Sequence, residues 1–344
     1  MKSEQKVSKT IEIFSRWNPN LSQTLFVRTK KTFLIIFVTF CSFPNFPRHR
    51  GFALLAALAL VCMHAHAEEI SFEGGKIDAQ FDGQPTQAQR DVATRWIQNA
   101  GRAVANYYGK FPVSRAVVRI SLVDGTKGRG GHASGWNGPR IQISLGRSAT
   151  DATLADDWEL THEMLHLCFP SLERQHHWLE EGMATYCEPV ARARVGITTA
   201  ERVWGDMFEG MPQGEPQSGD RGLDYTHTWG RTYWGGALFC LQADVEIRRR
   251  TNNRYGLEHA LRAIAAAGGT IEHDWDIDRV IAVGDQAVGV PVLRELYDQN
   301  KATPVTVDLN ALWKKLGVTQ TGDKASFRDD TPLASVRKTI TEGR

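Results

Sequence analysis

The sequence predicts an α+β domain, with strands in its first part and helices in its second. Three observations support this prediction. Short β-type stretches dominate residues 70–145, helical periodicity dominates the chain after residue 150, and no internal repeat is present. Strands that come before helices, rather than alternating with them, are typical of α+β domains.

Residues 48–67 have the composition of a secretory signal. A basic start at Arg48 precedes an apolar run, and Ala65-His66-Ala67 stands directly before Glu68. The apolar run is too short to span a bilayer as a helix. We therefore expect a periplasmic or secreted mature chain that begins at Glu68 and has no stable membrane span. Residues 1–47 are expected to be an over-extended translation start or a disordered N-terminus.

The charge balance gives no sign of a nucleic-acid partner. The 344 residues include 41 Lys and Arg against 39 Asp and Glu, a net charge of +2, but residues 1–67 hold 9 of the basic and 2 of the acidic residues. The chain from Glu68 onward is therefore mildly acidic and lacks a basic footprint. It keeps three cysteines, Cys168, Cys187 and Cys240, an odd number that predicts no disulfide framework. Nothing in the composition indicates an oligomeric state.

The first half of the mature chain is expected to form strands around one long helix. In that helix, Val92, Trp96, Ile97, Ala100 and Val104 recur at helical spacing. The expected elements are strands at 70–72 and 77–81, a helix at 86–108, and strands at 116–123 and 140–145. The Gly-rich segment 125–138 is expected to be a loop. The strand at 140–145 is expected to lie at the sheet edge, where an extended peptide could pair with it.

The second half is expected to be helical and to end in a loose tail. Helices are expected at 151–168, 180–190, 232–251, 257–267, 291–299 and 309–316. The polar segment 209–224 is expected to be an exposed loop. The domain is therefore expected to cover residues 68–318, with residues 319–344 as a loose C-terminal tail.

The helix at 151–168 contains His162-Glu163-Met164-Leu165-His166, an HExxH motif. Residues four apart lie on one face of a helix, so both imidazoles can bind one metal ion, and zinc suits imidazole ligands. Glu163 follows the first ligand and can reach a metal-activated water without binding the metal itself. The alternative is an amphipathic helix that happens to contain two histidines.

A second motif favours the metal site over that alternative. The segment 178–186, WLEEGMATY, begins a dozen residues after His166. A catalytic zinc needs a third protein ligand and an open position for water. Glu181, near the start of a second helix, can supply that carboxylate. His176 and His177, just before this helix, could line the cleft but are expected to lie at the surface.

HEMLH followed by WLEEGMATY resembles the gluzincins of peptidase clan MA, in particular the aminopeptidase N-like and glycyl-aminopeptidase-like branches. The resemblance covers residues 158–264, under half of the chain. It implies a thermolysin-like metallopeptidase catalytic domain, in which a small mixed sheet packs on the active-site helix and a mostly helical half follows. It also implies Zn²⁺ bound by His162, His166 and Glu181, with Glu180 outside the ligand set.

The same resemblance implies roles for two further residues. Glu188 is seven residues beyond Glu181. In the family, a carboxylate near this position orients a zinc-bound histidine. Tyr233 matches a tyrosine that donates a hydrogen bond to the oxyanion. A surface carboxylate and a buried structural tyrosine are the respective alternatives. The sequence departs from the family pattern at Gly235, where a lysine is usual.

The sequence thus predicts a zinc metallopeptidase that hydrolyses peptide or protein substrates with Glu163 as general base. A GxMEN-type exopeptidase loop is missing before His162, so the choice between endo- and exopeptidase activity stays open. Two other functions also stay open. One is a non-catalytic zinc-binding scaffold of the cell envelope, although such a site would not need Glu163. The other is hydrolysis of a non-peptide amide or ester.

Overall fold

The computed structural model describes residues 13–15, 24–29, 32–37, 68–322 and 324–343, in two units that divide between His64 and Ala65. In the first unit, β1 (Ile13–Ser15), β2 (Thr24–Thr29) and β3 (Thr32–Phe37) pair antiparallel. The secretory signal expected at 48–67 lies outside the described residues, as does most of the segment 1–47. Both expectations therefore stay predictions. In the described part of the chain, no helix combines the length and apolar character needed to cross a membrane.

The second unit begins with a small mixed sheet of five strands in the order β4-β5-β6-β8-β7. Neighbouring strands β5 and β6, and β6 and β8, pair parallel, whereas the outer pairs β4–β5 and β7–β8 are antiparallel. The strands are β4 (Glu68–Phe72), β5 (Gly75–Asp82), β6 (Arg115–Val123), β7 (Gly128–Ser134) and β8 (Arg140–Gly146). The expected strands are all present, and the sheet is mixed, as the resemblance implied.

The edge of this sheet differs from the sequence prediction. The Gly-rich segment expected to be a loop forms β7, and β8, expected at the edge, lies inside the sheet between β6 and β7. Glycine has low β propensity, so composition hides a strand whose backbone pairs with β8. The register shifts between Arg129 and His132, where Gly130 has a φ of +66° that favours glycine. The free edge that could accept a peptide is therefore β7.

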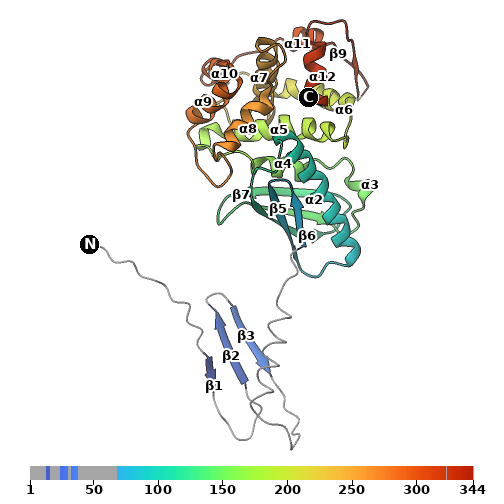
Figure 1. Cartoon of the computed structure of the whole chain (residues 1–344), viewed down its shortest axis with the longest axis vertical. Helices are drawn as coiled ribbons and strands as arrows, with labels where there is room; N and C mark the ends of the chain where they lie inside the picture. Colours follow the sequence, from blue (N-terminus) through green and yellow to red (C-terminus); the bar gives the residue numbers. More distant parts are fainter. Residues whose placement is uncertain (1–12, 16–23, 30–31, 38–67, 323, 344) are drawn as a thin grey trace, which may run out of the picture. The chain divides into compact units, whose positions relative to one another are not determined.

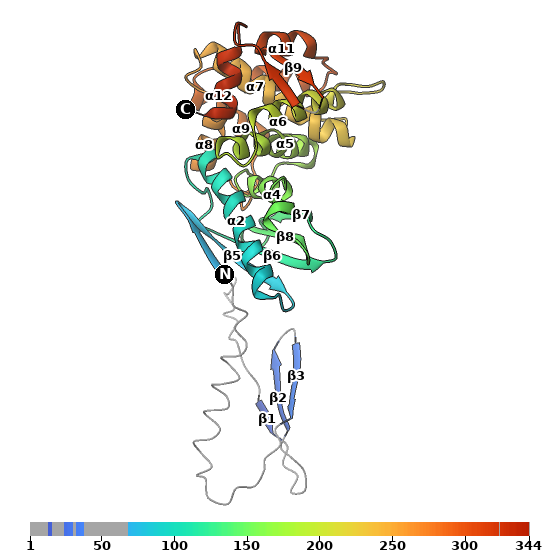
Figure 2. The same ribbon diagram turned by 90° about the vertical axis from the view of Figure 1, so that its right-hand side faces the viewer.

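Two helices cover the sheet and connect it to the rest of the domain. Helix α2 (Gln87–Tyr108) begins at a capping box formed by Thr86 and Gln89, and its apolar face is buried against the sheet. Helix α4 (Glu159–His166) lies between β7 and the helices above (Figures 1 and 2). The single helix expected at 151–168 is divided into a short turn, α3 (Asp151–Leu154), and α4. Between them, Asp157 accepts a hydrogen bond of 2.8 Å from Trp96 Nε1.

The half after α4 is mostly helical, as predicted. Its longer helices are α5 (His177–Arg194), α6 (Ala200–Gly210), α7 (Gly236–Arg250), α8 (Leu257–Ala266), α9 (Ile277–Val288), α10 (Val292–Asn300) and α11 (Leu309–Leu316). Two short 3₁₀ turns, η1 (Arg174–His176) and η2 (Met211–Gly214), and a π-helical turn, η3 (Arg231–Gly235), connect them. Helices α6 and α9 were not predicted. The expected exposed loop at 209–224 contains the buried Met211, Leu223 and Asp224.

A close crossing of two helices places the residues of the site. A Cβ added to Gly182 on α5 would lie 2.2 Å from the backbone carbonyl carbon of Gly236, at the start of α7. The helices can approach this closely only because both positions are glycine. Tyr186 on α5 also donates a hydrogen bond of 2.8 Å to Asp244 on α7. The crossing therefore brings the segment before α7 next to the first turns of α5.

The C-terminal residues are folded, so the expectation of a loose tail at 319–344 is wrong. Strands β9 (Val318–Thr321) and β10 (Lys324–Phe327) form a hairpin, and α12 (Ala334–Glu342) packs against α5, α7 and α11. The polar composition of the segment hid a narrow apolar stripe in which Val336 and Ile340 are buried. Arg337, also buried, donates to the carbonyl of Leu316 at 2.9 Å.

Truncating the buried Ile340 tests this packing. We expect Ile340→Ala to lower the free energy of unfolding by about 2–5 kcal/mol, because it leaves a cavity in the core. Glu342→Ala, at an exposed position of the same helix, should change it by less than about 0.5 kcal/mol. Denaturant unfolding of both variants and the wild type measures the difference. Equal stability of the two variants would mean that α12 does not pack on the domain.

Candidate metal centre

His162, His166 and Glu181 meet at the junction of α4 and α5. Their candidate ligand atoms all lie within 4.8 Å of one another. His162 Nε2 lies 3.2 Å from Glu181 Oε2 and 3.3 Å from His166 Nε2. His166 Nε2 lies 3.5 Å from the same Glu181 oxygen. Two imidazole nitrogens and one carboxylate oxygen are a donor set that zinc takes in catalytic sites, so the residues fit this metal.

Two of the three side chains, His162 and Glu181, are held in the protonation state that binds a metal, whereas His166 would release a proton on binding. Burial favours the neutral form of His162 and lowers its pKa, although the hydrogen bond with Glu181 acts to raise it. Burial also disfavours the charged form of His166, but the hydrogen bond and charge of Glu181 outweigh it and raise that pKa. Burial alone would raise the pKa of Glu181, whereas hydrogen bonds from the surrounding histidines hold it well below its usual value. The carboxylate therefore stays ionised, the form that binds a cation.

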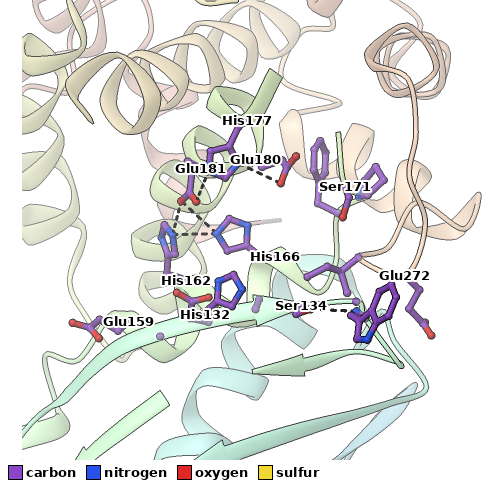
Figure 3. Close-up of a pocket in the computed structure, with 18 of the residues that line it drawn as sticks. His132, Ser134, Glu159, His162, His166, Ser171, His177, Glu180, Glu181 and Glu272 are labelled. Atoms are coloured by element: carbon purple, nitrogen blue, oxygen red, sulfur yellow. Dashed lines mark hydrogen bonds and ion pairs between the residues drawn. The ribbon is translucent and has the colours of Figure 1, made fainter. Parts of the chain in front are cut away.

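An open cavity of about 730 Å³ lies over this cluster. Figure 3 shows the ligand residues on one side of the cavity, below His177, with β7 and its His132 along the opposite side. Among the residues that the structure describes, five further carboxylates and no Lys or Arg line it: Glu159, Glu163, Glu180, Glu272 and Asp274. The cavity is accessible from solvent, since Trp136 and Trp158 on its lining are largely exposed.

Glu163 lies beside the ligand cluster without being part of it. Its side chain packs against the backbone of β7, where a Cβ added to Gly131 would lie 2.5 Å from Glu163 Cγ. Glycine at this position therefore leaves room for the carboxylate between α4 and the sheet edge. Glu163 therefore lies next to the candidate ligand cluster and lines the cavity.

Tyr233 reaches the same site from the π-helical turn before α7. Its ring stacks on that of His162, with centroids 6.4 Å apart, and on that of Trp229, 5.7 Å apart. Burial raises the pKa of Tyr233, and the charges of Glu181 and Glu163 raise it further. The hydroxyl therefore keeps its proton and can donate a hydrogen bond into the cavity. π-Helical turns are frequent at functional sites.

His177 belongs to the site and, as predicted, lies at the surface, where about half of its side chain is exposed. Its Nε2 lies 3.2 Å from Glu181 Oε1, the carboxylate oxygen that does not face His162. Its Nδ1 lies 3.6 Å from Glu180 Oε2, and Glu180 in turn accepts a hydrogen bond of 2.8 Å from the Leu172 amide. Glu180 is thus turned away from the ligand cluster. The spacing of four residues between His177 and Glu181 on one helix could have revealed this contact.

Removing His177 should weaken metal binding through Glu181. Groups that hydrogen-bond a metal ligand typically contribute about 10–100-fold to metal affinity, and we expect His177→Ala to raise the dissociation constant for zinc by that factor. His132→Ala is the matched control, since His132 lines the same cavity from β7. Competition of each protein with a chromogenic chelator measures the affinity. An unchanged affinity for His177→Ala would show that Glu181 needs no such support.

Glu188 does not contact a ligand histidine, contrary to the role that the family resemblance implied. Its carboxylate accepts a hydrogen bond of 2.9 Å from Arg192, and within the described residues no hydrogen bond or ion pair joins it to His162 or His166. Burial raises the pKa of Glu188 to about 7, although the charge of Arg192 acts to lower it. His176, also expected at the surface, is buried and contacts Asp224 at 3.0 Å.

One solved structure supports the fold. No protein-family profile and no curated protein matches the chain. Among solved structures, an aminopeptidase N family protein from Idiomarina loihiensis matches with a TM-score of 0.56 and 17% identity, over 74% of this chain and 49% of that one. An M1 zinc metallopeptidase from Deinococcus radiodurans matches with a TM-score of 0.46 and 15% identity, over 70% and 52%.

The chain thus spans about half the length of the solved structures that it matches. At 17% identity, the match to the Idiomarina loihiensis protein shows a shared fold and nothing further. The fold of this chain therefore resembles that of an aminopeptidase N family protein, with a small mixed sheet and a mostly helical half.

Proposed function

We propose that the protein is a zinc-dependent peptidase of the gluzincin type, with a thermolysin-like catalytic domain. One observation supports the proposal most strongly: a zinc-compatible set of His162, His166 and Glu181 lies beside the non-ligating Glu163 in an open cavity. A structural zinc site would close its fourth position with another protein ligand. Here the described residues supply a group of three candidate ligands that lines an open cavity, where a substrate can reach it.

Glu163 is the general base in this proposal. When bound, zinc supplies Lewis-acid chemistry, which polarises the scissile carbonyl and lowers the pKa of water. Glu163 accepts a proton from the attacking water and then passes it to the leaving amine. The contact with the Gly131 backbone holds the Glu163 side chain against β7, so its carboxylate has a fixed place beside the substrate.

The free edge of β7 provides a binding surface for the peptide backbone. An edge strand has unpaired amide and carbonyl groups, to which an extended peptide can add as a further strand. Because β7 lines the cavity along residues 130–134, a peptide bound in this way passes over the ligand cluster. The sequence predicted that the strand at 140–145 would pair with the peptide. We propose β7 for this pairing instead, because β7 is the edge strand.

Tyr233 donates a hydrogen bond to the oxygen of the attacked carbonyl as negative charge develops on it. Removing one such donor typically costs about 10²–10³-fold in rate, and we expect Tyr233→Phe to lower kcat for peptide hydrolysis by that factor with zinc content unchanged. Tyr225→Phe is the matched control, since Tyr225 is half-exposed and does not line this cavity. If both variants kept wild-type kcat, Tyr233 would be a structural residue only.

The proposal is tested by incubating the zinc-loaded protein with a mixed peptide library and identifying new peptide termini by mass spectrometry. New termini that need zinc are expected, and their positions distinguish endo- from exopeptidase activity. Bound zinc without new termini would leave the two other functions, a non-catalytic envelope scaffold or a hydrolase of non-peptide amides or esters. A panel of ester and amide substrates separates those two. Export to the periplasm or medium, based on the signal-like residues 48–67, is proposed on sequence alone.

A further inference from the structure

A second cavity, of about 410 Å³, adjoins the metal cavity. Trp158, His162 and Tyr233 line both cavities, so a substrate positioned at the metal site has direct access to the second one. Its other walls come from the later turns of α5, from α6 and from the segment before α7. Its volume falls within the range of about 300–1,000 Å³ that is usual for ligand sites.

Aromatic rings form the side of this cavity that faces the metal centre. Trp229 stacks on Tyr233 with a centroid distance of 5.7 Å and an interplanar angle of 27°, and it leaves 61% of its surface exposed. Trp158 meets the His162 ring edge-on at 5.6 Å and is 51% exposed. Trp234 is fixed against α6, where a Cβ on Gly210 would lie 2.0 Å from its ring. Exposed tryptophans held in place beside a cavity are well suited to bind an apolar ring.

Most of the charged groups that line the second cavity have partners within the protein, and the remaining one, Asp156, is exposed to solvent. Glu188 pairs with Arg192 at 2.9 Å, and Arg202 pairs with Asp206 at 2.9 Å. Glu209 accepts a hydrogen bond of 2.6 Å from Gln320. The two ion pairs balance their own charges, so fewer unpaired carboxylates face this cavity than face the metal cavity. An uncharged apolar group is the ligand that this lining favours.

We propose that this second cavity, lined by Trp158, Trp229 and Tyr233, is a specificity subsite. It binds an aromatic or large apolar side chain at one of the two positions flanking the scissile bond. The inference rests on the proposed peptidase function and names its substrate class. Because Trp229 stacks on Tyr233 and both line this cavity, a side chain next to a carbonyl held at Tyr233 can enter the cavity and contact the Trp229 ring.

The test compares quenched peptides that differ only in having Phe or Ala at each flanking position in turn. We expect kcat/KM to be about 10–100-fold higher for Phe at one of the two positions, the scale expected for burying such a side chain. Trp229→Ala should reduce this ratio to about threefold or less with zinc content unchanged, and Trp229→Phe should restore part of it. Tyr225→Ala, at an exposed aromatic outside both cavities, should keep the full ratio. Since Trp229 also touches Tyr233, the ratio rather than the absolute rate is decisive.

A binding experiment keeps this inference separate from the peptidase proposal. Zinc-loaded Glu163→Gln protein is titrated with the same peptides in a calorimeter, which needs no turnover. If the wild type cleaves nothing but the Phe peptide binds at least about tenfold tighter in a Trp229-dependent way, the peptidase proposal fails, and the second cavity remains a binding site for an aromatic side chain. Equal binding of the Phe and Ala peptides overturns the subsite. Trp229-dependent binding of N-acetylglucosamine instead would also overturn it, in favour of a sugar site.

Discussion

Glu163→Gln is expected to lower peptide hydrolysis by at least about 10²-fold and up to about 10⁴-fold, while the zinc content stays near that of the wild type. The amide keeps the shape of the side chain and its packing against Gly131, but it cannot accept the proton of the attacking water. Zinc content stays the same because Glu163 is not one of the three ligands. Rates on a quenched peptide and metal analysis of the same preparation give both quantities.

Glu159→Gln is the matched control for this variant. Glu159 lies one helical turn before Glu163 on α4 and lines the same cavity, and its charge is removed by the same change. A fall in rate confined to Glu163→Gln separates general-base catalysis from a general loss of negative charge. If Glu163→Gln were as active as the wild type, the proposed mechanism would be wrong.

The second large effect is loss of the metal. His162→Ala, His166→Ala and Glu181→Ala should each remove most of the bound zinc after dialysis, because a site with two protein ligands holds zinc far more weakly than one with three. Glu180→Ala is the control, since Glu180 points to His177 and the Leu172 amide. Metal analysis, with circular dichroism to verify folding, measures the result. If Glu180→Ala emptied the site and Glu181→Ala did not, the ligand assignment would be off by one residue.

The parts of the site that sequence predicts are those set by spacing along a helix. His162 and His166 lie on one face because residues four apart do so in any α-helix. Glu181 comes from a different helix, and its place beside them depends on how α4 and α5 pack. Only the family resemblance selected it over Glu180. The same resemblance led to Tyr233, which does face the cavity, and to Glu188, which pairs with Arg192 instead.

The fold was predictable where patterns are local and not where they depend on distant pairing. Strand positions follow from the alternation of apolar and polar residues. The order β4-β5-β6-β8-β7 depends instead on pairing between segments far apart in the sequence. Strand β7 was missed because glycine side chains add nothing to a strand pattern. Helix α12 was missed because its buried Val336 and Ile340 lie among polar residues. Helix α9 was the avoidable error, since Ile277, Val280, Ile281, Gly284 and Val288 recur at helical spacing.

The most direct test of the central claim is a zinc titration of the full chain. The protein is stripped with a chelator, zinc is added back in steps, and bound zinc and peptide cleavage are measured on each sample. We expect cleavage to be absent in the stripped protein, to rise in proportion to bound zinc and to level off at about one zinc per chain, as a single three-ligand site requires. Cleavage by the stripped protein, or a fully loaded protein that cleaves no peptide, would contradict the claim that this is a zinc-dependent peptidase.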